Sequence, residues 1–161
     1  MGATIRRIVE ADWPRARELR LRALQDTPDA FAATYAEELA MSDAQWQARA
    51  RSNAAGRDTA GFFALDGERE IGVAVGVRKL PAVELNAMWV APEARRRGAA
   101  RALVEAVAAW ALEIGASELL LEVTQTSRAA QALYRELGFV ELDASSCGAR
   151  RAAAVRMRRT L

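Results

Sequence analysis

The chain has 161 residues, of which 52% are hydrophobic and 27% are charged, and its formal net charge is +2. This composition is typical of a soluble globular protein, and its apolar runs are shorter than the roughly 20 residues of a membrane-spanning helix. With no histidine and a single cysteine, Cys147, the chain has no intrachain disulfide, no histidine-activated nucleophile and a poor ligand set for zinc. We therefore expect no metal site.

The N-terminal residues lack the apolar core of a signal segment, so we expect a cytoplasmic protein that binds no membrane. Arginine clusters at 95–97, 150–151 and 156–159 are compatible with a nucleic-acid partner. However, nucleic-acid-binding domains usually have a broader positive balance and exposed stacking aromatic residues, so we expect no nucleic acid. Cys147 lies in a segment rich in Ser, Gly and Arg, and we interpret it as an exposed inert thiol.

The first ninety residues predict a strand, then helices, then three strands. Asp12 and Pro14 are typical of a helix start, and the turn residues Asp66-Gly67-Glu68 favour a hairpin. The expected elements are a strand at 4–9, a helix from Asp12 to about Leu24, a short helix at 30–40, a helix capped by Ser42 and Asp43, and strands at 59–65, 71–79 and 82–90.

The second half predicts a helix between two strands, which implies a right-handed parallel crossover. A long helix at 98–114 has an apolar stripe and ends at Gly115. The strand at 118–124 contains three consecutive leucines, a run typical of a strand covered on both faces. Ser127 is expected to cap the next helix, and 139–142 with 153–160 form a final antiparallel pair. No linker or repeat divides the sequence, so we expect one domain over residues 1–161.

The most informative segment follows the strand that ends at Val90. Pro92 stops this strand, and Arg95-Arg96-Arg97-Gly98 opens the long helix. Amide groups at a helix N-terminus bind phosphate oxygens, and a glycine lets a ligand approach the main chain. The P-loop is excluded because no Lys-Ser or Lys-Thr pair occurs, and the dinucleotide fingerprint lacks its glycines. The alternative is a basic helix start on a solvated surface.

This segment is similar to the acetyl-CoA pyrophosphate loop of the GNAT acetyltransferase superfamily, Arg/Gln-x-x-Gly-x-Gly/Ala. A second segment, 127–139, resembles the other GNAT signature, Asn-x-x-Ala-x-x-Leu-Tyr-x-x-x-Gly-Phe, with Ser127 in place of the Asn. The resemblance implies the GNAT fold across essentially the whole chain. This is an α/β fold with a mixed, predominantly antiparallel sheet and a central parallel pair of strands that splay apart.

The resemblance also implies acetyl-CoA as co-substrate and assigns residues to it. The pantetheine arm would pair with the main chain between the two splayed strands, and Ser127 would take the place of the family Asn with a shorter reach. The pyrophosphate would lie on the basic loop. The implied binding residues are Met88, Trp89, Val90, Arg95, Arg96, Arg97, Gly98, Ala99, Ala100, Arg101 and Ser127.

Two residues are candidates for proton transfer. Glu84 precedes the loop by the offset at which some GNAT enzymes place a catalytic base, with Asn86 on the same strand face; the alternative is a solvated or ion-paired strand residue. Tyr134 is the candidate acid for the departing thiolate, and the alternative is a core aromatic residue. By the same resemblance, a main-chain N–H at a strand bulge near Met88 would hold the oxyanion.

The resulting hypothesis is an N-acetyltransferase that moves an acetyl group from acetyl-CoA to a primary amine, by direct attack in a ternary complex. The acceptor is a small-molecule or peptide amine. Phe31, Tyr35 and Trp46 are expected in the core rather than at the acceptor, and the sequence leaves a homodimer open. The rival hypotheses are a non-catalytic acyl-CoA-binding module, which Ser127 keeps open, and a nucleic-acid-binding protein.

Overall fold

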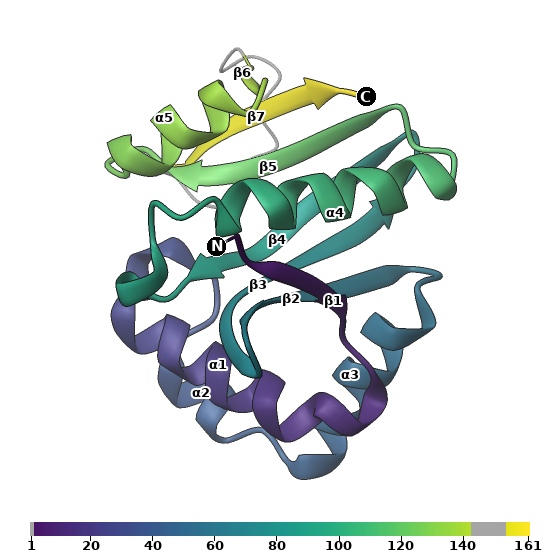
Figure 1. Ribbon diagram of the computed structural model, residues 1–161, viewed down its shortest axis with the longest axis vertical. Helices are drawn as coiled ribbons and strands as arrows, with labels where there is room; N and C mark the ends of the chain where they lie inside the picture. Colours follow the sequence, from purple (N-terminus) through teal and green to yellow (C-terminus); the bar gives the residue numbers. More distant parts are fainter. Residues whose placement is uncertain (1, 143–153) are drawn as a thin grey trace.

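The computed structural model describes residues 2–142 and 154–161. Its strands form one sheet in the order β1-β2-β3-β4-β5-β7-β6 (Figure 1). All neighbouring strands are antiparallel except β4 and β5, which are parallel. The predicted mixed sheet with one central parallel pair is therefore confirmed. The strands are β1 Thr4–Arg7, β2 Thr59–Asp66, β3 Arg69–Lys79, β4 Ala82–Val90, β5 Glu118–Thr124, β6 Val140–Glu141 and β7 Ala154–Thr160.

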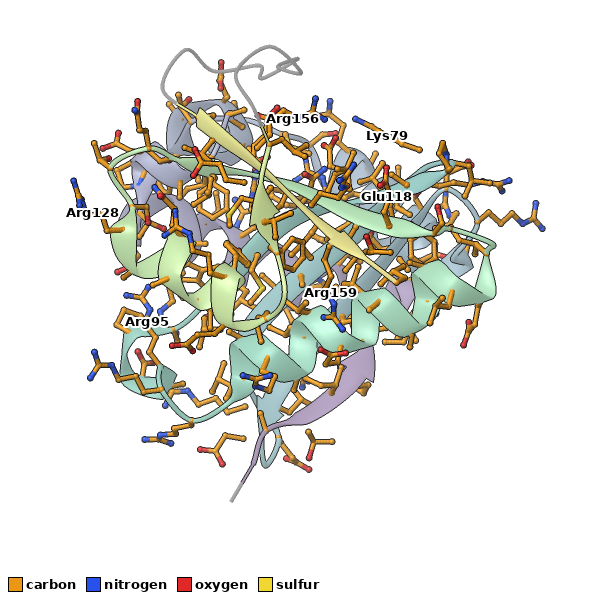
Figure 2. All side chains as sticks on the ribbon, turned by 90° about the horizontal axis from the view of Figure 1, so that it is seen from above. Lys79, Arg95, Glu118, Arg128, Arg156 and Arg159 are labelled. Atoms are coloured by element: carbon orange, nitrogen blue, oxygen red, sulfur yellow. The ribbon has the colours of Figure 1, made fainter. Side chains whose placement is uncertain are left out.

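Helices cover both faces of the sheet (Figure 2). A side chain at Gly76 of β3 would collide with Trp110 of α4, whereas one at Gly61 of β2 would collide with Asn53 of α3. Because Gly76 is paired with Ala60, the residue next to Gly61, the two helices lie on opposite faces. The helices are α1 Trp13–Asp26, α2 Tyr35–Leu39, α3 Asp43–Ala55, α4 Ala99–Glu113 and α5 Arg128–Glu136, with short 3-10 helices η1 Glu10–Asp12, η2 Pro28–Ala30 and η3 Pro92–Ala94.

The predicted helix at 30–40 is wrong over its first residues. Phe31 is extended, and helix α2 begins only at Tyr35. Thr34 caps it, since the Thr34 side chain accepts from the Glu37 amide while the Glu37 carboxylate accepts from the Thr34 amide. The residues between η2 and Thr34 therefore belong to no helix.

Asp12 is the N-cap residue of α1, as predicted, but its side chain does not cap this helix. The Asp12 carboxylate accepts from the Val9 amide at 2.8 Å and pairs with Arg6 at 2.8 Å, so it stabilises the turn before the helix. Strand β1 consequently ends at Arg7 instead of residue 9. Ser42 does cap its helix, together with Gln45.

Helix α4 and strand β5 occupy their predicted segments. Gly115, with a φ of +86°, ends α4 as expected. Strand β5 differs in its burial, because Leu119 and Leu121 are buried whereas Leu120 is only half-buried. The expectation of a strand covered on both faces is therefore wrong, and one face of β5 remains available beside β4.

No helix among the described residues is long and apolar enough to cross a membrane. The expected thiol at Cys147 lies outside the described residues.

Candidate active site

The parallel strands β4 and β5 pair only at one end. Their register runs from Ala82 opposite Glu118 to Glu84 opposite Leu120, and there the pairing stops. Both strands continue beyond this point, β4 to Val90 and β5 to Thr124. The splayed pair implied by the family resemblance is therefore present.

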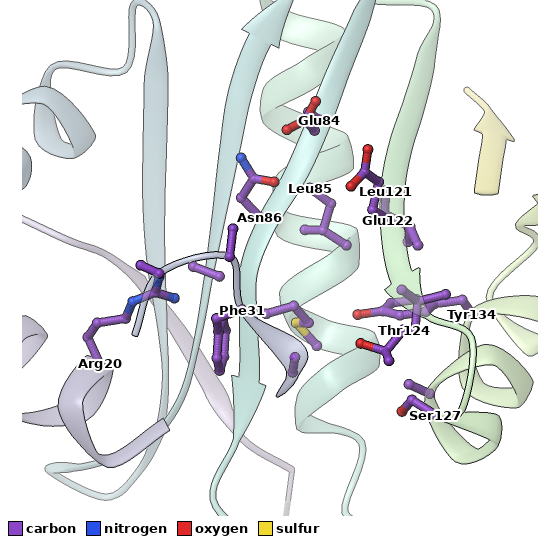
Figure 3. Close-up of a pocket in the computed structure, with 17 residues that line it drawn as sticks. Arg20, Phe31, Glu84, Leu85, Asn86, Leu121, Glu122, Thr124, Ser127 and Tyr134 are labelled. Carbon is purple, nitrogen blue, oxygen red and sulfur yellow. The ribbon is translucent and has the colours of Figure 1, made fainter. Parts of the chain in front are cut away.

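A cleft of about 330 Å³ occupies the widening between the two strands (Figure 3). Its walls come from both strands, from the start of α5 and from the segment after η2. Residues 84–88 of β4 and residues 121–124 of β5 line it, together with Arg20, 30–33, Ser127, Ala130 and Tyr134. An extended ligand can thus lie between the two strands.

Strand β4 bulges where it borders the cleft. The register with β3 passes from Val75 opposite Asn86 to Val73 opposite Trp89, so Ala87 and Met88 together face a single residue. Ala87 has a φ of +54°, which is strained for a residue with a side chain. A bulge leaves one residue out of the strand ladder, so its amide is free to point at a ligand. The bulge expected near Met88 is present.

The basic loop ends in a helix start without a side-chain cap. Gly98 is the N-cap residue of α4, with a φ of +84°, and no side chain caps the helix. The first amides of α4, from Ala99 to Arg101, have no acceptor within the helix. A Cβ at Gly98 would meet open space. The loop therefore presents main-chain donors and a helix dipole to an anion, as its sequence predicted.

Arg95 is bound to other parts of the protein, although 45% of its side chain is exposed. Its guanidinium donates to the Val90 carbonyl at 2.9 Å and to the Asp26 carboxylate at 2.6 Å. Asp26 also accepts from the indole N–H of Trp89 at 3.0 Å. These contacts tie the end of α1 to the end of β4 and to the loop. Arg95 was predicted to bind phosphate, whereas in the structure it holds the loop in place. Figure 2 shows Arg95 beside the loop that leads into α4.

Glu84 lies where the strands separate, and it is ion-paired. Its carboxylate accepts from Lys79 Nζ at 2.8 Å, and only 14% of its side chain is exposed. It also lines the cleft, as does Asn86. Of the two alternatives stated for Glu84, the ion-paired strand residue is observed, and its role as a base stays a prediction.

Tyr134 lines the cleft from α5 and is almost completely buried. Burial raises the pKa of the Tyr134 hydroxyl above its ordinary value, so the group is a neutral donor at physiological pH. Its ring makes an edge contact with Phe139, with the ring centroids 5.7 Å apart. Packing on Phe139 fixes the ring, which gives the hydroxyl a defined position at the cleft.

A buried glutamine, which the sequence analysis did not single out, fixes the start of α5. Gln131 donates to the carbonyls of Thr124 and Gln125 at 3.1 and 2.8 Å, so it ties α5 to the end of β5. Ser127 begins this helix, but its side chain makes no cap hydrogen bond, contrary to expectation. Ser127 instead lines the cleft.

The wall of the cleft nearest α1 contains residues for which the sequence offered little signal. Phe31 lines it, although core packing was expected, whereas Trp46 is buried in the core as predicted. Arg20 and Glu122 also line the cleft. Glu122 lies on a strand that the sequence predicted, but Arg20 reaches the site only through the packing of α1.

Among the described residues, no group of histidine, cysteine, aspartate or glutamate side chains has the arrangement of a metal site. The chemistry available from the described residues is therefore a carboxylate, a buried phenol, main-chain amides at a bulge and a positively polarised helix start. This set can bind an anionic ligand and transfer protons beside it.

A model of the acetyltransferase (GNAT) family matches residues 12–139, so the chain belongs to this family. The two strands of the cleft, the basic loop and α5 therefore lie within the matched region.

The chain is also similar to the aminoglycoside N(6')-acetyltransferase type 1 of Acinetobacter genomosp. 13, with 34% identity over 68 residues. This match covers 42% of the chain and 47% of that protein, so the chain matches about half the length of this curated relative.

Solved structures share the fold over nearly the whole chain. The acetyltransferase of GNAT family from Streptococcus pneumoniae has a TM-score of 0.81 at 15% identity, covering 99% of each chain. The PaiA N-acetyltransferase from Thermoplasma acidophilum, solved in complex with coenzyme A, has a TM-score of 0.73 at 16% identity, covering 100% of each chain. At these identities the similarity establishes the fold.

Proposed function

We propose that the protein is an acetyl-CoA-dependent N-acetyltransferase that acetylates a primary amine by direct attack in a ternary complex. The observation that carries this proposal is the early end of the β4–β5 pairing at Glu84, with a cleft between the diverging strands and an uncapped helix start after β4. The N-acetyltransferase relative and the coenzyme A complex of a protein with the same fold support the choice of donor and reaction.

The residues fit the parts of acetyl-CoA. In the proposed complex the diphosphate lies on the amides that start α4, with Gly98 leaving open space and Arg96, Arg97 and Arg101 supplying charge. The pantetheine arm pairs with the main chain of Met88 to Val90, and Ser127 contacts it from α5. Arg95 acts by holding the loop against Asp26.

The chain's own residues supply the proton transfers. Glu84 takes a proton from the acceptor ammonium, directly or through one water, since an alkylamine with a pKa of about 10.4 is protonated at neutral pH. The N–H at the Ala87–Met88 bulge stabilises the oxyanion of the tetrahedral intermediate. Tyr134 gives its proton to the departing thiolate, whose own pKa is also raised in a dry site, and it regains a proton from the nitrogen of the intermediate as the amide forms. The two protons that the ammonium group loses thus go to Glu84 and, through Tyr134, to CoA. The acceptor is a small-molecule or peptide amine, and we propose neither a nucleic acid nor a membrane as partner.

Ligand binding and turnover are tested separately. Acetyl-CoA at about 100 times its Kd stabilises the folded state by roughly 2.7 kcal/mol, which a melting curve detects. Release of CoA is then measured across a panel of primary amines. Binding of acetyl-CoA without release of CoA in any reaction would favour the non-catalytic acyl-CoA-binding module. If acetyl-CoA does not shift the melting temperature and the protein binds a random DNA duplex in a salt-dependent way, a nucleic-acid-binding protein would be favoured.

The assignment of Glu84 has a matched control. Glu84→Gln should lower kcat about 100-fold, because general base catalysis contributes a factor of this order. Glu118→Gln, at the start of β5 and outside the cleft, removes another half-buried ion-paired carboxylate and should leave kcat unchanged. Equal effects of the two substitutions would contradict the catalytic role.

A further inference from the structure

Arg20 projects from α1 to the wall of the cleft, where it lies over the ring of Phe31 (Figure 3). The guanidinium carbon is 4.5 Å from the ring centroid. Both residues line the cleft, and only 18% of the Arg20 side chain is exposed. Stacking on an aromatic face restrains the plane of the guanidinium group and keeps it at the cleft.

An ion-paired triad holds Arg20 from behind. The buried Glu38 carboxylate accepts from Arg20 Nε at 2.7 Å and from Arg20 Nη2 at 3.3 Å, and it also accepts from Arg49 Nη1 at 3.2 Å. Two guanidinium groups therefore share one carboxylate, which leaves one positive charge. Although burial alone would raise the pKa of Glu38, its hydrogen bonds and ion pairs with Arg20 and Arg49 outweigh burial and lower that pKa.

The unused donors of Arg20 point away from Glu38. A guanidinium group has five N–H donors, and Glu38 occupies the side formed by Nε and Nη2. The end formed by Nη1 and the second hydrogen of Nη2 makes no hydrogen bond to a described residue. This end has the two parallel donors that match a carboxylate.

We propose that Arg20 binds a carboxylate of the acceptor, so that the acceptor is a primary amine with a carboxylate close by, as in an α-amino acid. The inference rests on the proposed function of the cleft. Of the acidic residues that line the cleft, Glu84 is already paired with Lys79. The carboxylate of the acceptor then faces the surplus charge at Arg20, and its ammonium group lies within the cleft.

The test compares acceptors that differ only in this carboxylate. L-alanine, L-methionine, L-phenylalanine and L-glutamate are each assayed against the corresponding α-carboxamide, with spermidine as a polycationic amine. The expected result is that the best acid exceeds its amide by about tenfold or more in kcat/KM, since a charge-assisted bidentate contact is lost. An amide or spermidine used as well as every acid would overturn the proposal.

Three variants separate recognition from structural support. Arg20→Gln should reduce the acid-to-amide ratio to near one without changing the Kd of acetyl-CoA. Arg49→Gln disrupts the same triad, but Arg49 does not line the cleft, so this variant should keep the acid-to-amide ratio. Arg17→Gln, one turn earlier on α1, should keep it as well. A ratio that falls equally in Arg49→Gln, or that persists in Arg20→Gln, would contradict a direct contact.

Direct binding provides a second measurement that needs no turnover. In the presence of CoA, the preferred acid should raise the melting temperature of the wild type but not of Arg20→Gln, and its amide should raise neither. If neither compound shifts the wild type although acetyl-CoA does, the inference about Arg20 fails while the proposed donor site stands. If acetyl-CoA itself produces no shift, the proposed function fails first.

Discussion

The two glycines at the ends of helix α4 allow a controlled test of the diphosphate site. Gly98 and Gly115 have nearly the same backbone, with φ values of +84° and +86°, and a Cβ at either would meet no atom within 4 Å. Alanine at either position therefore adds no collision, and its cost is the left-handed backbone alone. This cost is about 1–2 kcal/mol.

Gly98→Ala and Gly115→Ala should consequently lower the melting temperature by similar amounts, about 2–4 °C per kcal/mol for a chain of this size. Their response to acetyl-CoA should differ, because only Gly98 lies where the diphosphate is proposed to contact the main chain. With acetyl-CoA at about 100 times the wild-type Kd, a tenfold weaker Kd in Gly98→Ala reduces the stabilisation from roughly 2.7 to about 1.4 kcal/mol. Gly115→Ala should keep the full value.

Glutamate substitutions at Gly98 and Gly115 provide a second comparison of the two helix ends. At the helix N-terminus a carboxylate is favourable to the folded state, and at the C-terminus it is unfavourable, by about 0.3–1 kcal/mol each. Gly98→Glu should therefore be the more stable of the two glutamate variants, yet it should lose the acetyl-CoA response entirely because its charge repels the diphosphate. Melting curves with and without acetyl-CoA measure both quantities. Equal acetyl-CoA shifts in the Gly98 and Gly115 variants would refute the placement of the diphosphate.

Tyr134→Phe should lower kcat at least about tenfold with little change in the Kd of acetyl-CoA, since it removes only the hydroxyl; an unchanged kcat would remove Tyr134 from the mechanism. Asp26→Asn should raise the KM for acetyl-CoA severalfold by freeing Arg95, whereas Asp66→Asn, which affects only a 3.8 Å surface pair, should not. Glu38→Gln should lower the free energy of unfolding by about 2 kcal/mol at pH 7. Because the pKa of Glu38 is lowered in the folded state, the loss of stability in Glu38→Gln should be complete above the ordinary pKa of 4.5 and should shrink as the pH falls through the folded-state pKa. Denaturation of both proteins at several pH values measures this difference in the free energy of unfolding.

The sequence predicted the elements around the donor site well because their signals are local. The cleft strands were predicted at Ala82–Val90 and, from a run of leucines, at Glu118–Thr124, and the structure has these bounds. Gly115 marked the end of α4 through its own backbone preference. The motif around Gly98 and the one ending at Phe139 indicated the family that the comparison confirms. The wrong predictions were also local in origin, since Thr34 and Asp12 form side-chain hydrogen bonds that composition did not reveal.

The proposed acceptor site depends on residues that local signals do not connect. Arg20 reads as an ordinary arginine on an amphipathic helix, and Phe31 reads as a core aromatic residue. They meet only because α1 packs beside the segment that follows η2, and Glu38 joins them from α2. No local pattern in a single sequence indicates that these three side chains are in contact.

The sequence by itself determined the order of the elements, the position of the turn that is proposed to bind an anion, and the family, because periodicity, glycine positions and a motif at fixed spacing are properties of neighbouring residues. Only the tertiary structure decided where β4 and β5 separate, that Asp26 holds Arg95, and that Arg20 faces the cleft. These features depend on how distant segments pack, since each requires side chains from elements that are far apart along the chain to share one position in space.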